Sequence, residues 1–135
     1  MNITIFLLAA LCIPLSLSAE DKVEYSSDPS KDSGIGYPSV NEALSALKQK
    51  EGVALRVERG WTVAKDSKEN TMWSFTPEGH PAHPAAVKRS FFEKDGGIYM
   101  TMNVLCQATK KECDKLVAEF QELNKRIKKN MQSNK

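Results

Sequence analysis

After its first nineteen residues, the 135-residue chain has no long apolar run and no large excess of charge of either sign. Its 19 lysines and arginines are nearly balanced by 17 aspartates and glutamates, which gives a net charge of +2. Nucleic-acid-binding domains usually concentrate a large basic excess on one face, so this balance argues against a nucleic-acid partner. Only seven glycines and six prolines occur, and 41% of the residues are apolar. These values exclude a collagen-like or wholly disordered chain and predict one small globular domain.

The chain also lacks the short motifs that identify common catalytic sites. It has no GxSxG segment for a nucleophilic serine and no glycine-rich phosphate-binding loop. Ser74 or Ser90 beside a histidine could serve a hydrolase, but no motif surrounds either serine. Glu78 and Glu93 are candidates for paired glycosidase carboxylates only because no better pair is present. An enzyme is therefore the least favoured of three interpretations, and the sequence predicts no cofactor.

The first nineteen residues are typical of a secretory signal peptide. They contain no charged side chain, and most of them are Ile, Leu, Phe or Ala. Pro14 is followed by small residues up to Ala19, where a signal peptidase would cleave, and acidic residues come next. The stretch is short for a membrane span, although an uncleaved anchor and, through Cys12, a lipoprotein are alternatives. The sequence predicts a signal peptide at 1–19 and a periplasmic or secreted protein with no membrane insertion after cleavage.

Removal of that segment leaves two cysteines, Cys106 and Cys113. In an oxidising compartment such an even pair usually forms a disulfide. The spacing suits a bridge between the end of a predicted strand and the first turn of a predicted helix. A reactive or metal-binding pair is the alternative, but neither a CxxC spacing nor a nearby histidine supports it. We therefore predict a structural Cys106–Cys113 bridge.

Hydrophobic periodicity predicts a helix at each end of the folded region, with strands between them. Ser39 and Thr109 each begin a capping box, and the apolar stripes that follow predict helices over 40–50 and 110–130. Alternating apolar residues predict strands over 53–58, 61–64, 71–76, 86–94 and 98–106. The prediction is a single α+β domain over 37–130, in which four or five antiparallel strands carry both helices on one face.

The segments on either side of this domain are predicted to be flexible. Residues 20–36 are rich in Ser, Asp, Lys and Gly and have almost no apolar spacing, which is typical of a flexible leader. Residues 131–135 are predicted to be a disordered tail.

The most unusual stretch is the run WSFTPEGHPAHPAAVKR at positions 73–89. Its three prolines restrict the backbone, and both histidines of the protein lie among them. A stiff loop that presents histidine, carboxylate and aromatic groups is suited to recognition. The alternative is a rigid connection between two strands, whose histidines only cap backbone groups. The predicted binding residues are Trp73, Phe75, Glu78, His80, His83 and Arg89.

A metal site is a second interpretation of the same stretch. His80 and His83, with Glu78 nearby, would offer imidazole and carboxylate ligands to zinc or copper, and Met100 or Met102 would add a soft sulfur ligand for Cu(I). Against this, an HxxH pair outside a helix is a weak signal, and strand alternation already explains both methionines. The alternative prediction is thus a small periplasmic metal-binding protein that uses His80 and His83.

With GWTVAKD before it and CQATKKECDKLVAEFQELN after it, the run at 73–89 resembles a group of small, uncharacterised exported proteins of proteobacteria. The similarity covers about Gly36 to Arg126. It implies an exported protein of similar fold, and it transfers no functional residues.

The favoured interpretation is a noncatalytic, monomeric binding or accessory protein of the periplasm. We expect it to recognise a protein, a peptide or an envelope component. The expected contact surface is the loop that carries the prolines and histidines, together with the neighbouring sheet face.

Overall fold

The structure is a computed structural model that describes residues 22–26 and 32–134. The predicted signal peptide at 1–19 lies outside these residues. The described residues form two helices and six strands in the order β1 (Lys22–Ser26), α1 (Val40–Gln49), β2 (Val53–Glu58), β3 (Trp61–Asp66), β4 (Thr71–Phe75), β5 (Ala85–Lys94), β6 (Gly97–Cys106) and α2 (Lys110–Ser133). Within the described ranges, no helix is both long enough and apolar enough to cross a membrane.

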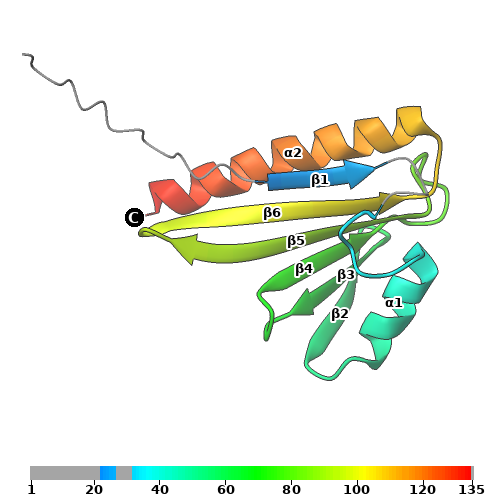
Figure 1. The fold of residues 1–135 in the computed structure, drawn as a ribbon, viewed down its shortest axis with the longest axis horizontal. Coiled ribbons are helices and arrows are strands. Elements are labelled where there is room, and N and C mark those ends of the chain that lie inside the picture. The colour runs from blue at the N-terminus through cyan, green and yellow to red at the C-terminus, as the bar shows by residue number, and fades with distance from the viewer. Residues whose placement is uncertain (1–21, 27–31, 135) are drawn as a thin grey trace, which may run out of the picture.

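All six strands form one sheet in the order β1-β6-β5-β4-β3-β2. Strands β2 to β6 are antiparallel neighbours in chain order, and the long β5–β6 pair is in register from Ala85 opposite Cys106 to Lys94 opposite Gly97. This confirms the predicted α+β domain with five antiparallel strands between two helices. Figure 1 shows α2 running along β6, while α1 lies at the other end of the sheet.

The prediction of a flexible leader over 20–36 is wrong for part of that segment. Lys22–Ser26 forms β1, which pairs in parallel with β6 at the edge of the sheet. Ile35 is also buried, with 1% of its surface exposed, in the cluster under α1. Both were missed because a short strand and a single anchoring residue leave no periodic pattern. The disordered tail predicted over 131–135 is wrong for residues 131–133, because α2 continues to Ser133, and residue 135 lies outside the described residues.

The predicted placement of both helices on one sheet face is also wrong. Consecutive residues of a strand point to opposite faces. In β5, Val87 belongs to the cluster that packs against α2, whereas its neighbour Ala86 belongs to the cluster that packs against α1. The central strands are therefore apolar on both sides, and each side needs a helix to cover it.

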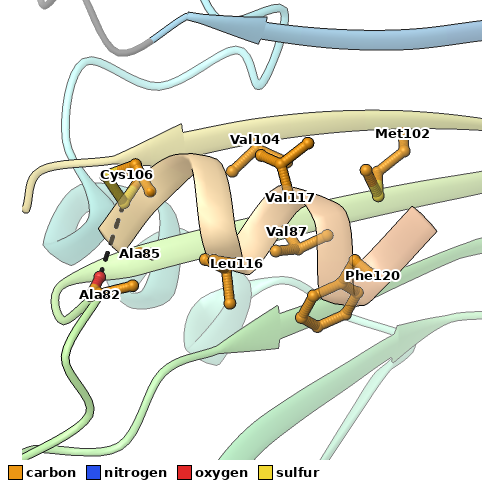
Figure 2. Close-up of a cluster of buried hydrophobic side chains, with 10 residues drawn as sticks. Ala82, Ala85, Val87, Met102, Val104, Cys106, Leu116, Val117 and Phe120 are labelled. Atoms are coloured by element: carbon orange, nitrogen blue, oxygen red, sulfur yellow. Dashed lines mark hydrogen bonds between the residues drawn. A yellow bond between two sulfur atoms is a disulfide. The ribbon is translucent and has the colours of Figure 1, made fainter. Parts of the chain in front are cut away.

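Helix α2 covers the half of one face that is formed by β5 and β6. Figure 2 shows its buried stripe lying over Val87, Met102 and Val104. The stripe repeats every three or four residues, which is the spacing of one helix face, and it consists of Cys113, Leu116, Val117 and Phe120.

Helix α1 covers the opposite face near β3 and β4. Ser39 caps the helix by accepting a hydrogen bond from the Glu42 N–H at 3.2 Å, as the capping box predicts. Under the helix, the rings of Trp73 and Phe75 stack with their centroids 6.1 Å apart, and the edge of Tyr37 meets Trp73 at 5.9 Å.

A disulfide between Cys106 and Cys113 joins the end of β6 to the first turn of α2. This confirms the predicted bridge. Both cysteines are buried in the cluster beneath α2, where Cys106 also touches the carbonyl of Ala82 in the loop before β5 (Figure 2). The bridge therefore fixes the position at which α2 begins to cross the sheet.

Replacement of both bridging cysteines by alanine should lower the free energy of unfolding by about 2.5 kcal/mol. The estimate follows from the loop entropy that a short disulfide loop removes from the unfolded chain. Urea unfolding of the oxidised protein and of Cys106→Ala/Cys113→Ala measures the difference, and reduced wild-type protein is the control. Titration of two free thiols in the native, purified protein would contradict the bridge.

A buried carboxylate holds the end of α1 to the turn after β3. Asp66 has only 2% of its side chain exposed, and its Oδ2 lies 2.7 Å from Nζ of Lys50, the residue that follows α1. Its Oδ1 accepts the backbone N–H groups of Lys68 and Glu69 at 3.1 and 3.2 Å. The hydrogen bond from Lys50 is the main reason why the pKa of Asp66 falls below its ordinary value.

The stabilisation from Asp66 should depend on pH. Asp66→Asn keeps an acceptor for the turn but loses the charge, so its Tm should be lower than that of the wild type at pH 7. The pKa of Asp66 is lower in the folded protein than in the unfolded chain, where it is about 4. The Tm difference between the two proteins is therefore fully present above about pH 4, and it vanishes as the pH falls through the pKa of folded Asp66. Thermal unfolding of both proteins across the acidic range tests this, with Glu93→Gln as a control that removes an exposed carboxylate far from Lys50 in sequence. A Tm difference independent of pH would contradict it.

Candidate functional site

The six predicted binding residues do not form one surface. Trp73 and Phe75 are 4% and 3% exposed and lie in the core beneath α1. Arg89 pairs with Met72 across β4 and β5, while Trp73 pairs with Lys88, so Arg89 faces the opposite side of the sheet. The prediction that Trp73 and Phe75 join the loop in a single recognition surface is therefore wrong. Strand alternation separates residues that are close neighbours in sequence or register.

The Pro/His loop, defined as residues 77–84, connects β4 to β5 by two successive turns. The His80 N–H donates to the Pro77 carbonyl at 3.1 Å, and the His83 N–H donates to the His80 carbonyl at 2.8 Å. Glu78 is exposed. The loop is thus held by its own backbone hydrogen bonds, as expected for a stiff connection.

The two histidines of the loop are used differently. Nδ1 of His80 accepts the Ala82 N–H at 3.1 Å, and the His80 ring meets the Trp61 ring edge-on with centroids 5.2 Å apart. Nδ1 of His83 lies 3.1 Å from both the hydroxyl and the carbonyl oxygen of Thr76. Each histidine therefore makes a local hydrogen bond, which is the structural role that the sequence left open.

The residues described by the structure include no group of three or more His, Cys, Asp or Glu side chains that could hold a metal ion. Of the two sulfur ligands considered, Met102 lies in the core beneath α2, and Met100 is likewise buried. Within the described part of the chain, His80 and His83 thus have no third ligand from His, Cys, Asp or Glu.

The contact between His80 and Trp61 connects the Pro/His loop to a cleft that sequence reasoning missed. The cleft has a volume of about 540 Å³ and lies on the α2 side of the sheet. Helix α2 covers β5 and β6 there, and among the described residues no second helix packs on the neighbouring surface of β2 to β4. One side of the cleft is formed by α2 and the other by residues of β2, β3 and β4.

The wall of the cleft is largely apolar. Trp61 and Val63 of β3 lie on one side, and Phe120 and Leu123 of α2 lie on the other. The rings of Trp61 and Phe120 are in contact, with centroids 5.7 Å apart. Ser74 of β4 adds a hydroxyl. Aromatic and aliphatic walls combined with polar groups are typical of ligand-binding sites.

Arg89 lies in the floor of this cleft and is 5% exposed. Its Nη1 donates to Oδ1 of Asn124 and its Nη2 to Sδ of Met72, each at 3.4 Å, and its Cζ lies 5.4 Å from the centre of the Phe120 ring. Among the described residues Nε has no hydrogen-bond partner, and no carboxylate forms an ion pair with Arg89. Burial alone lowers the pKa of Arg89 below its ordinary value.

The mouth of the cleft carries charges of both signs. Glu58 and Arg59 lie at the β2–β3 turn, and Glu119 and Arg126 lie on α2. Glu58 is already paired with Arg56, whose Nη2 is 3.2 Å from Glu58 Oε2. The charge of the mouth is therefore nearly balanced, in contrast to the unbalanced cation in the floor.

The cleft could not be found from the sequence because its residues come from β2 to β5 and α2. In the alternation of β5, Arg89 occupies a position equivalent to Val87, which indicates that it faces the α2 side. The alternation of β5 therefore predicts that the charge of Arg89 lies on the α2 side of the sheet, but it does not predict the cleft.

Comparison of the chain with protein-family models, with curated proteins and with solved structures finds no match.

Two substitutions test which side chain holds the ends of the Pro/His loop together. Thr76→Val should lower the free energy of unfolding by about 1–3 kcal/mol, because it leaves the buried Ala85 N–H, now 2.9 Å from Thr76 Oγ1, without an acceptor. His83→Ala should cost less than about 1 kcal/mol, because His83 is exposed. Urea unfolding measures both. A larger loss of unfolding free energy for His83→Ala than for Thr76→Val would contradict the conclusion that Thr76 holds the loop in place.

Proposed function

We propose that this protein is an exported, noncatalytic binding protein whose ligand surface consists of the Pro/His loop and the adjoining cleft. The proposal keeps the loop as part of the surface and replaces the buried Trp73 and Phe75 with residues that line the cleft. The ligand is a protein, a peptide or an envelope component that extends from the loop into the cleft.

The observation that carries this proposal is a continuous row of three rings. His80 of the loop contacts Trp61 at 5.2 Å, and Trp61 contacts Phe120 of α2 at 5.7 Å. Trp61 and Phe120 line the cleft, so one ligand can touch the loop and both cleft walls at once. Large, rigid aromatic side chains of this kind are frequent anchors in binding interfaces.

Two further observations support export. The Cys106–Cys113 disulfide is stable in oxidising compartments and rare in the cytosol. The sequence also begins with the segment predicted to be a signal peptide. The resemblance to small exported proteobacterial proteins agrees with both and remains part of the proposal.

Site-specific photocrosslinking in cells tests the proposed surface. A photoreactive amino acid is placed at Glu78 in the loop or at Arg126 at the mouth of the cleft, and at Lys48 on α1 as a control on the opposite sheet face. We expect a discrete adduct from the first two positions and none from Lys48.

The adduct at position 126 should also disappear in Trp61→Ala, which removes one wall of the cleft, and persist in Leu55→Ala, which truncates an exposed side chain on β2. Mass spectrometry identifies what is captured. No adduct at either test position, or the same adducts at Lys48, would contradict the proposed surface.

A further inference from the structure

We infer that Arg89 is the anchor for a carboxylate group, and that the ligand of the cleft is an apolar chain or ring that ends in this carboxylate. The inference rests on the proposed function and names the chemistry of its ligand. It is carried by the buried, unbalanced charge of Arg89 at the bottom of an apolar cleft.

The charge of Arg89 has no counterion in the part of the chain that the structure describes. Its polar contacts are an amide oxygen and a thioether sulfur, both at 3.4 Å, and its Nε has no acceptor there. A buried cation is costly unless it is paired, and a neutral amide together with one aromatic ring compensates that cost only in part. A bound anion would supply the missing partner.

The shape of the guanidinium favours a carboxylate. Its planar set of donors matches the two oxygens of a carboxylate, and such pairs are among the strongest hydrogen bonds in proteins. The hydroxyl of Ser74 lies in the same lining and adds a neutral polar group. The position of Arg89 in the floor would place the anionic end of a ligand deepest in the cleft.

The surroundings of Arg89 indicate what else the ligand contains. Trp61, Val63, Phe120 and Leu123 form walls that would bury an apolar body. A volume of about 540 Å³ suits a small molecule or the end of a peptide. The nearly balanced charge at the mouth favours a ligand with a single negative charge over a polyanion.

Such a carboxylate has two sources: a free amphipathic acid, or the C-terminus of a peptide. Decanoate represents the first source, and decanol is its uncharged control. A pentapeptide that ends in phenylalanine represents the second, and the same peptide with an amidated C-terminus is its control.

Binding of all four probes is measured on the purified, disulfide-bonded protein by calorimetry and by tryptophan fluorescence. In Trp73→Phe the only tryptophan left is Trp61, which lies in the cleft, so the fluorescence change reports this site. We expect decanoate or the free-acid peptide to bind about ten- to a hundredfold more tightly than its uncharged control, which is the range for a hydrogen-bonded charge.

Substitutions of Arg89 test whether this residue causes the preference for an acid over its uncharged control. Arg89→Met should abolish the difference between acid and control, while its Tm should stay the same or rise, because an uncompensated buried charge is removed. Arg89→Lys keeps the charge but loses the planar fork, so it should retain part of the preference. Lys48→Gln removes an exposed cation on the opposite sheet face, outside the cleft, and should leave the preference unchanged.

Equal binding of acids and uncharged controls to the wild-type protein would overturn the inference without any variant. A preference that survives in Arg89→Met would also overturn it, because the carboxylate would then be held elsewhere. Either result leaves the proposed surface standing if crosslinking still maps to the loop and the cleft. Binding of decanoate alone, or of the peptide alone, identifies the source of the carboxylate.

Discussion

The two-sided apolar character of the central strands determines the rest of this structure. Val87 and Ala86 are neighbours in β5, yet one packs beneath α2 and the other beneath α1. Burying only one side would leave the other in contact with water, which costs a free energy of about 25 cal/mol for every Å² of exposed apolar surface. The fold therefore requires one helix on each face, and each of these helices covers only part of a six-stranded sheet.

This incomplete cover explains where the cleft lies. Helix α2 is fixed at its start by the Cys106–Cys113 bridge and then follows β5 and β6. Within the described ranges no second helix lies over β2, β3 and β4 on that face, and the side of α2 that carries Leu123 forms a wall beside them. Trp61 lies against both this wall and the Pro/His loop, so the loop and the cleft form a continuous surface.

Much of the fold could be predicted because it depends on local patterns. The caps at Ser39 and Thr109 and the alternation in the five antiparallel strands each occupy a few consecutive residues. The bridge could be predicted from the count and position of the cysteines. Three features depend on residues far apart in sequence, so no local pattern predicts them: the placement of the helices on opposite faces, the pairing of β1 and the cleft. Glu78 and His80 were correctly placed in the loop, but the burial of Trp73 depends on which face α1 covers.

Lys88 and Arg89 illustrate how strand alternation gives two adjacent cations different properties. Nζ of Lys88 lies 5.3 Å from the centre of the Trp73 ring, on the α1 side, and its half-buried side chain keeps access to water. Arg89 points to the α2 side, where Phe120 covers its guanidinium and only weak neutral acceptors approach it. A lysine placed there would lose its strong hydration, whereas a guanidinium is more weakly hydrated and keeps its charge when buried. Stability alone would favour an apolar residue at this position, since replacing buried charges by packed apolar groups is often neutral or stabilising. The presence of an arginine beneath an apolar cleft is accounted for if a ligand uses its charge, which has no counterion among the described residues.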